Sequence, residues 1–560
     1  MLKTIDRYFQ TIRHLRAIQI YGRIWFKLKR VSPNFAPAPP IRSQNLTWTP
    51  VAKREPSLLS EKIFFLLNQK GDLDVIGWNG TQRDKLWRYN QHYFDDLNAR
   101  DGNQRMDWHE HLIERWILEN PPGYGTGWDP YPTSLRIVNW IKWSLGGGAL
   151  TQDSLQSLAI QARWLSEKLE YYLQGNHLLS NAKALIFAGL FFEGSEADGW
   201  LNIGLGVLAD EISEQILADG GHFERSTMYH ALALEDILDI CNLTRSYKFD
   251  KSFNFSDESL LAVCKKLCED CVLKMTRWLK TLQHRDGEIS FFNDSAFGVA
   301  PSSVELEDYA TRLGLYSPEV SMPVVYLQQS GYVRLEKKDA VALIDMAPIG
   351  PDHIPGHAHA DTLSFEFSLG QQRLIVNGGT SVYGIGLDRQ QQRSTRSHST
   401  LVINRKNSSD VWAGFRVARR ARVFDCETGV GDTLFARAAH DGYSRFKGGP
   451  VHRREWRLSE GAFEVKDVVT GSGPHLIEIF FNLGPGLTPR RDAERLKLIE
   501  DRGGLSLAYL FLSGQSNVHF ERKDWHPFFG KSVPTWSVVV RTQCILPFEH
   551  HALFQWSSMH

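Results

Sequence analysis

The sequence predicts a multidomain protein of the α+β class, in which an all-α domain is followed by an antiparallel β-sandwich. Its 560 residues exceed what a single hydrophobic core usually holds. From about residue 105 to 320, apolar side chains recur at spacings of three and four, which is typical of helices. After about residue 323 they alternate with a period of two, which is typical of strands. This change of period predicts the order of the two domains.

Residues 1–90 form an N-terminal extension of mixed and helical character, with a Pro-rich stretch at 33–40. The all-α domain is expected over residues 91–322. Its predicted helices include Asp153–Gln174, Leu178–Phe192, Gly199–Ala218, Thr227–Tyr247 and Glu258–Leu282. Short connections between successive helices predict antiparallel hairpins, arranged as a bundle, a solenoid or a closed toroid.

The all-β domain is expected over residues 323–560. Its predicted strands are Val324–Leu335, Ala340–Met346, Thr362–Leu369, Arg373–Asn377, Thr400–Asn404, Ala421–Cys426, Thr433–Ala438, His452–Leu458, Ala462–Val469, Leu476–Leu483, Leu505–Phe511 and Ser537–Val540. A dozen antiparallel strands with no helices between them predict a sandwich of stacked sheets. Because pockets favour domain interfaces, we expect the chemistry where helical loops face a sheet.

Composition narrows the class of partner and the compartment. The net charge is zero, so no electrostatic argument favours nucleic acid, although a local basic cleft could bind an acidic polymer. No apolar run has the length of a transmembrane helix. Residues 1–30 lack the apolar core and cleavage site of a secretory signal, so a cytoplasmic location is expected, with the periplasm or cell envelope as the alternative. Their basic, amphipathic pattern fits a helix that packs on the protein, or one that rests on a membrane.

Four segments contain the candidate chemical groups. They are Gly175–Asn181 before an apolar helix, Asp219–His230 at a helix start, Gly356–Phe365 at the mouth of a predicted strand, and Leu374–Thr380 with Arg393–Ile403. In the first two, Asn176 or Ser180 could simply cap one helix, and Ser226 or Thr227 the next. In the third, His357 and His359 lie two residues apart, so strand geometry would point both rings to one face. Such a pair suits a metal ligand beside a second functional group.

These segments resemble those of the heparinase II/III family of bacterial polysaccharide lyases, over roughly residues 85–540. The matching text is Asn176-His177-Leu178, Phe223–Ser226 with Tyr229-His230, Gly356–Asp361 with Ser364-Phe365, Val376–Thr380 and Arg396–Thr400. The resemblance implies an incomplete (α/α) toroid joined to an antiparallel β-sandwich, with the site between them. It also implies a carbon–oxygen lyase that cleaves an acidic, uronate-containing polysaccharide by β-elimination.

The resemblance further implies roles for single residues. Asn176 and His357 would bind the uronate carboxylate, while His177 and Tyr229 would transfer protons. A depressed phenol pKa would let Tyr229 act as base and acid together in a syn elimination; in an anti elimination His177 would be the base. Tyr383 is a further candidate contact to substrate.

The family's metal site maps onto His359, Asn377 and His398. Here Asn377 stands where the family has Asp, and a neutral amide is a weaker ligand for a divalent cation. One divalent metal, zinc first, is therefore an expectation, and the alternative is that Asn377 hydrogen-bonds both histidines without a metal. In the family this metal is mainly structural.

Two other functions remain open at this point. A glycoside hydrolase on the same scaffold needs two carboxylates that flank the bond, for which Glu224 and Asp361 are candidates. A glycan-binding or assembly protein without catalysis is the other. Candidate subsite residues are Arg136, Trp128, Tyr131 and Trp140, although helix packing explains them equally well. The sequence does not identify the polymer, endo or exo action, or an oligomeric state.

Overall fold

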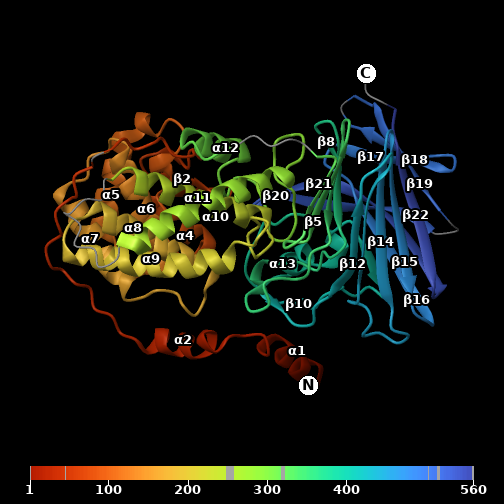
Figure 1. Cartoon of the computed structure of the whole chain (residues 1–560), viewed down its shortest axis with the longest axis horizontal. Coiled ribbons are helices and arrows are strands. Elements are labelled where there is room, and N and C mark those ends of the chain that lie inside the picture. The colour runs from red at the N-terminus through yellow and green to blue at the C-terminus, as the bar shows by residue number, and fades with distance from the viewer. Residues whose placement is uncertain are drawn as a thin grey trace.

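The computed structural model describes residues 2–44, 46–247, 258–316, 322–501, 503–513 and 517–557. Figure 1 shows helices gathered at one end of the molecule and sheets at the other, with the first two helices along one edge. The predicted fold class is confirmed. The helical part is an incomplete (α/α) toroid, and the sheets form an antiparallel β-sandwich.

The toroid is built around α8, whose residues 178–191 are all buried. Helices α6, α7, α9 and α10 pack against it. The predicted helix Asp153–Gln174 is too long, because α7 ends at Ser166 and the residues that follow form a turn. The helices are α3 (Leu73–Ile76), α4 (Lys85–Gln91), α5 (Met106–Glu119), α6 (Pro130–Leu145), α7 (Gln152–Ser166), α8 (Gly175–Phe191), α9 (Ser195–Gln215), α10 (Thr227–Arg245), α11 (Glu258–Thr281) and α12 (Ser303–Arg312).

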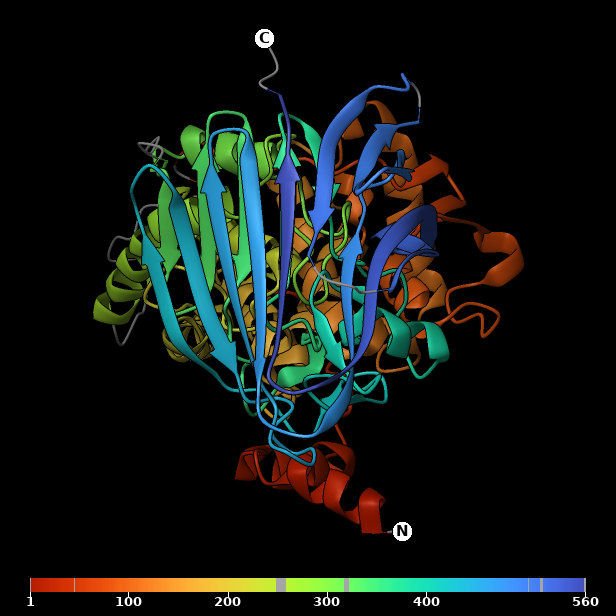
Figure 2. The ribbon, with the colours of Figure 1, turned by 90° about the vertical axis from the view of Figure 1, so that its right-hand side faces the viewer.

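The sandwich has an eight-stranded sheet on one side and a five-stranded and a four-stranded sheet on the other, sharing one apolar core. Figure 2 shows these strands from the side of the sandwich. In spatial order the eight strands are β12 (Val423–Gly429), β13 (Leu434–His440), β14 (Val451–Ser459), β15 (Ala462–Thr470), β22 (Phe548–Gln555), β19 (Ser506–Leu512), β18 (Arg495–Glu500) and β17 (Leu487–Asp492).

The five-stranded sheet is β4 (Val324–Leu327), β5 (Tyr332–Lys337), β6 (Ala340–Asp345), β7 (Phe365–Leu369) and β8 (Gln372–Ile375). The four-stranded sheet is β20 (Asn517–Phe528), β21 (Lys531–Ile545), β16 (Pro474–Asn482) and β9 (Leu401–Ile403). Two short strands, β10 (Val411–Trp412) and β11 (Arg416–Val417), pair with each other. The predicted strand Val324–Leu335 is in fact two strands, because the chain turns at Gly331, whose φ of 88° favours glycine.

The sequence predicted no helix in this domain, and this was wrong. A short helix, α13 (Leu387–Gln392), lies between β8 and β9. It is too short for a clear helical period and follows a segment rich in glycine, so the sequence pattern indicated a loop.

The N-terminal extension begins with α1 (Leu2–Ile12) and α2 (Ala17–Leu28), followed by a small sheet of β1 (Leu58–Ser60), β2 (Ile63–Leu66) and β3 (Gln69–Asp72). Helix α1 contacts the β-domain, where Asp6 pairs with Arg419 at 2.9 Å. The toroid is contacted through Arg16, which pairs with Glu214 at 2.7 Å. The extension therefore bridges the two domains. Among the described residues, no helix has the length and apolar character needed to cross a bilayer.

Candidate active site

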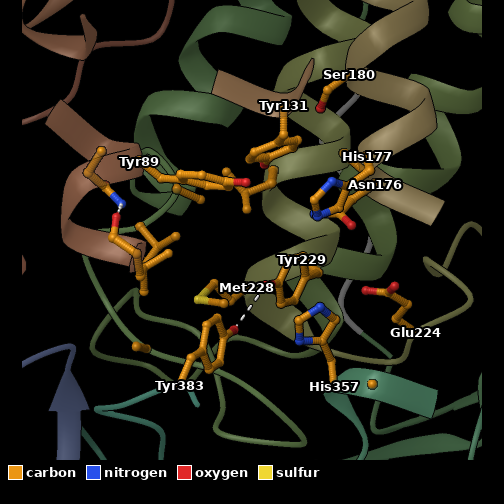
Figure 3. Close-up of a pocket in the computed structure, with 18 of the residues that line it drawn as sticks. Tyr89, Tyr131, Asn176, His177, Ser180, Glu224, Met228, Tyr229, His357 and Tyr383 are labelled. Carbon is orange, nitrogen blue, oxygen red and sulfur yellow. Dashed lines mark hydrogen bonds between the residues drawn. The ribbon is translucent and has the colours of Figure 1, made fainter. Parts of the chain in front are cut away.

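The candidate catalytic residues meet at one large cavity between the toroid and the sandwich. The cavity has a volume of about 1670 Å³ and is lined by both domains and by α1 and α2. Figure 3 shows Asn176, His177, Tyr229, His357 and Tyr383 around the same space. The sequence placed these five residues on four separate segments, and the fold brings them together.

Asn176 and His177 lie in the first turn of α8. The N-cap position of this helix is held by Gln174, which has a φ of 60° and makes no side-chain cap. Asn176 lies inside the helix and is therefore not its cap. The side chain of Asn176 is thus free to line the cavity. The capping explanation for the Asn-His pair is therefore wrong.

His177 is oriented by a buried carboxylate. Its Nδ1 lies 3.1 Å from Oε2 of Glu170, which is in the turn after α7. A carboxylate can only accept here, so Nδ1 bears the proton and Nε2 of the neutral ring keeps its lone pair. Burial by itself lowers the pKa of His177, but Glu170 more than offsets it, so the pKa lies above its usual value.

Tyr229 lies in the first turn of α10, where Ser226 caps the helix by accepting from the Tyr229 N–H at 3.1 Å. The Tyr229 hydroxyl is 2.9 Å from the Tyr383 hydroxyl. Burial, and then the neighbouring Tyr383, raises the pKa of Tyr229 well above its usual value. Burial therefore acts against the depressed phenol pKa that a syn elimination by Tyr229 alone would need.

His357 stacks on Tyr229, with ring centroids 3.9 Å apart. It ends a short 3-10 turn, Pro355–His357, rather than lying on a strand, and β7 begins only at Phe365. The prediction that the two histidines share one strand face is therefore wrong. The turn separates the directions of the two rings.

Both histidines nevertheless bind one carboxylate, that of Asp294. Its Oδ2 is 2.9 Å from Nδ1 of His357, and its Oδ1 is 2.8 Å from Nε2 of His359. Arg389 of α13 forms an ion pair with the same group. Burial alone would raise the pKa of Asp294, but Arg389 and the two histidines hold it well below its usual range.

The proposed metal ligands lie behind this carboxylate. Nδ1 of His359 is 3.2 Å from Nε2 of His398, and both rings are buried. Two imidazoles on one zinc ion, at about 2.1 Å each, place their nitrogens at a similar separation. Asp294 on the far nitrogen of His359 also matches the carboxylate–histidine–metal arrangement.

The third position fits less well. Asn377 is buried, its Oδ1 accepts from Ser399 N at 3.3 Å, and its Nδ2 has no hydrogen-bond partner. Among the described residues, no group of three or more His, Cys, Asp and Glu side chains could hold a metal. The donor set thus consists of two imidazoles and one neutral amide, which fits a weakly held cation.

Of the four predicted subsite residues, Arg136, Trp128 and Trp140 do not line the cavity. All three are buried in the toroid, and the Arg136 guanidinium lies 3.7 Å from the ring centre of Trp116. Their prediction as substrate-binding residues is wrong, because helix packing accounts for them. Tyr131, the fourth residue predicted in that segment, does line the cavity, together with Tyr89 and Met228.

The carboxylate pair expected of a hydrolase is also not formed. Glu224 lines the cavity, and burial raises its pKa, although His357 and His177 oppose this. Asp361 does not line it; the side chain is buried and accepts from Asn293 N at 3.0 Å. Glu224 and Asp361 therefore cannot flank one glycosidic bond.

Sequence reasoning missed Asp294, Glu170 and Arg389. Asp294 could have been noticed as part of a polar Asn-Asp-Ser run directly after an apolar one, at 293–295. Glu170 lay hidden inside a helix predicted to continue to residue 174. Nothing in the local pattern distinguishes Arg389 from its neighbours.

Comparison with known proteins identifies the family. The heparinase II/III N-terminus profile matches residues 105–264, and the heparinase II/III-like C-terminal profile matches residues 320–547. A heparin-sulfate lyase of Pedobacter heparinus is 26% identical over 344 residues, covering 56% of this chain and 49% of the relative. One from Bacteroides stercoris is 27% identical over 394 residues, covering 61% and 57%. The chain thus spans about half the length of the curated relatives it matches.

Solved structures share the fold. The crystal structure of heparinase III has a TM-score of 0.65 at 18% identity, covering 86% of this chain and 79% of that one. A heparan sulfate lyase from Pedobacter heparinus has a TM-score of 0.57 at 19% identity, covering 97% and 88%. With both family profiles in order along the chain, this protein belongs to the heparinase II/III-like family.

Proposed function

We propose that the chain is a polysaccharide lyase that cleaves a uronate-containing glycan by β-elimination and leaves an unsaturated uronate end. The observation that supports this best is the convergence of Asn176, His177, Tyr229 and His357 on one cavity. The curated relatives named heparin-sulfate lyase support the same activity.

The first step is recognition of the uronate carboxylate. The C5 proton next to a charged carboxylate is very weakly acidic, so the site must stabilise the enolate-like charge that develops. In the proposal the Asn176 amide and Nε2 of His357, as the imidazolium, donate to this carboxylate. Asp294 supports this role because it accepts from the other nitrogen of His357.

The second step is removal of the C5 proton by Nε2 of His177. The contact between Glu170 and Nδ1 supports this assignment, because it leaves the Nε2 lone pair available. As the C4–O bond breaks and the C4=C5 double bond forms, Tyr229 donates its phenolic proton to the leaving oxygen. A raised phenol pKa suits the acid, so the proposal is an anti elimination with two separate groups.

A divalent cation, zinc first, is proposed at His359, His398 and Asn377. When bound it would fix the loops behind His357, and no proton-transfer step passes through it. Elemental analysis of the purified chain, before and after dialysis against a chelator, tests occupancy. We expect a weakly held ion that the chelator removes.

The charge of the cavity narrows the substrate class. Nine Lys and Arg side chains and ten Asp and Glu side chains line it. Six of those cations already pair with carboxylates: Arg54, Lys85, Arg100, Lys142, Lys183 and Arg420. A densely sulfated chain needs an excess of cations, so we propose a substrate with isolated uronates and little or no sulfate.

A panel of uronate polymers, sulfated and unsulfated, tests the proposal. We expect a new near-ultraviolet absorbance from the unsaturated uronate, with the highest kcat/KM on an unsulfated polymer. Saturated products that incorporate solvent oxygen would instead indicate hydrolysis. Binding without any product after long incubation would support the glycan-binding alternative.

A further inference from the structure

Helix α2 packs across the β-domain and the toroid with its more polar side and turns its apolar side outward. Gln19 is buried and donates to the His353 carbonyl at 3.0 Å. Phe26 contacts Tyr172 with ring centroids 4.7 Å apart. On the opposite side, at helical spacings of one and four, lie the exposed side chains of Ile20, Tyr21, Ile24, Trp25 and Leu28.

Helix α1 is oriented in the same way. Asp6 pairs with Arg419 of the β-domain, and the Thr11 hydroxyl accepts from Trp412 Nε1 at 3.2 Å. Ile5 and Phe9 are exposed on the other side. We call Ile5, Phe9, Ile20, Tyr21, Ile24, Trp25 and Leu28 together the outer apolar face. Their exposed fractions lie between 51% and 71%.

The outer apolar face is separate from the cavity. None of its seven residues lines the cavity, whereas Tyr8, Ile12 and Leu15 of the same segment do. A stripe of aromatic and branched aliphatic side chains on the solvent side of a helix is unusual for a surface helix, which normally buries it. The stripe therefore indicates a partner rather than a substrate subsite.

The charge of the segment indicates which partner. Residues 1–32 contain eight Lys and Arg and a single acidic residue, Asp6. Among the described residues, four of these cations form no ion pair: Arg13, Arg23, Lys27 and Arg30. Lys27 and Arg30 are exposed beside Trp25 and Leu28. Apolar side chains flanked by unpaired cations match the interfacial region of a bilayer with anionic headgroups.

We propose that the outer apolar face docks on an anionic lipid bilayer, with α1 and α2 lying in the plane of the interface. Both helices project from the body at one edge, so a flat surface can reach them (Figure 2). Because Tyr8, Ile12 and Leu15 line the cavity next to this edge, docking places one end of the cavity beside the lipid surface. The proposal is independent of the catalytic one.

Flotation of the full chain with phospholipid vesicles tests the docking. We expect the chain to float with phosphatidylcholine vesicles that contain phosphatidylglycerol, and to float less without phosphatidylglycerol or at high salt. Leu28→Asp should lower the partition coefficient by about tenfold or more, because it places a charge where the helix enters the acyl region. Lys27→Glu with Arg30→Glu should remove the dependence on phosphatidylglycerol.

Leu118→Asp is the matched control. Leu118 is 82% exposed near the C-terminal end of α5, as Leu28 is 71% exposed at the end of α2. It should leave flotation unchanged, and both variants should keep the thermal unfolding midpoint. The proposal is overturned if the chain does not float with anionic vesicles, or if Leu118→Asp weakens flotation as much as Leu28→Asp. Sedimentation that reveals a dimer broken by Leu28→Asp, without flotation, would assign the face to a second copy instead.

Discussion

Three imidazoles of the site, those of His177, His357 and His359, each have one nitrogen held by a buried carboxylate. Glu170 holds Nδ1 of His177, and Asp294 holds Nδ1 of His357 and Nε2 of His359. For His177 and His357, which line the cavity, this arrangement fixes which ring nitrogen faces it before substrate arrives, so little reorganisation is needed during the reaction. Tyr229 lacks such a carboxylate and contacts a second phenol, which suits a proton donor.

Replacing Tyr229 by Phe removes the proposed acid while keeping its ring stack with His357. We expect kcat to fall by about 10²–10⁴-fold, the usual contribution of a general acid, with unchanged thermal unfolding. The rate of formation of the unsaturated product measures this. Tyr383→Phe keeps the Tyr229 proton and should cost less; equal losses in the two variants would contradict the assignment.

Replacing Glu170 by Gln should change the pH dependence of kcat/KM. The proposed base, His177, must be neutral, so activity rises as pH passes its pKa. Because Glu170 raises that pKa, its removal should move the rising limb to lower pH. The maximal rate should also fall, since the amide no longer selects one tautomer. A limb that stays in place would exclude His177 as the titrating base.

The sequence identified the residues that face the cavity better than those that hold them. Asn176, His177, Tyr229, His357 and Tyr383 stood in recognisable motifs. Asp294 lies 63 residues before His357, and Arg389 lies 95 residues after Asp294 on a short helix of its own, so no local spacing relates them. The error at Arg136 has the opposite cause. In a sequence, an Arg and a Trp that stack on each other inside a domain cannot be distinguished from an Arg and a Trp that bind a sugar, and here Arg136 stacks on Trp116.

At the scale of elements, α10 depends on its N-cap for both stability and the position of Tyr229. Ser226→Ala removes the acceptor for the Tyr229 N–H and should lower the free energy of unfolding by about 0.5–2 kcal/mol. It should also reduce kcat. Thr151→Ala, which removes the cap of α7 away from the cavity, should cost similar stability without reducing kcat. Denaturant titration and initial rates distinguish the two.

The ion pair between Asp294 and Arg389 joins α13 to the loop after α11. Asp294→Asn would leave Arg389 buried without a counter-charge, which typically costs about 3–5 kcal/mol. Asp467 forms a similar buried cluster with Arg454 and His452 inside the sandwich. We expect Asp467→Asn to lower the unfolding midpoint about as much as Asp294→Asn does, but to keep turnover at permissive temperature. Asp294→Asn should lower the unfolding midpoint and also abolish turnover.

Long elements were predictable because their apolar period is expressed over several turns or residue pairs. Helices α8 to α11 and most strands of the sandwich follow that rule. The short elements were not, because α13 and the turn Pro355–His357 are decided by contacts such as the Arg389–Asp294 pair rather than by period. The strand geometry assumed for His357 and His359 failed for this reason.

At the scale of the whole molecule, the near balance of charge in the cavity has a measurable effect. A strongly cationic cleft would bind a polyanion far more weakly as salt rises, because screening acts on the net charge. Here nine cations face ten carboxylates. We expect KM for an unsulfated uronate polymer to change by about twofold or less between low and physiological ionic strength. A steep rise would contradict the proposed substrate class.

The order and class of the domains followed from one change of period, but the orientation of the N-terminal helices did not. An amphipathic pattern states that a helix has two unlike sides, and only the structure reveals which side meets the protein. In α2, Gln19 and Phe26 face the protein, whereas Trp25 and Leu28 are exposed to solvent.

The bridge formed by α1 and α2 also limits how far the two domains can part. Helix α1 is fastened to the β-domain through Asp6, and α2 contacts both domains: Gln19 donates to the His353 carbonyl of the β-domain, and Phe26 packs on Tyr172 of the toroid. The seven helical steps between Gln19 and Phe26 span about 10 Å, and a helix cannot lengthen without breaking its backbone hydrogen bonds. At this edge the cavity can therefore widen only if α2 first releases one of the two domains.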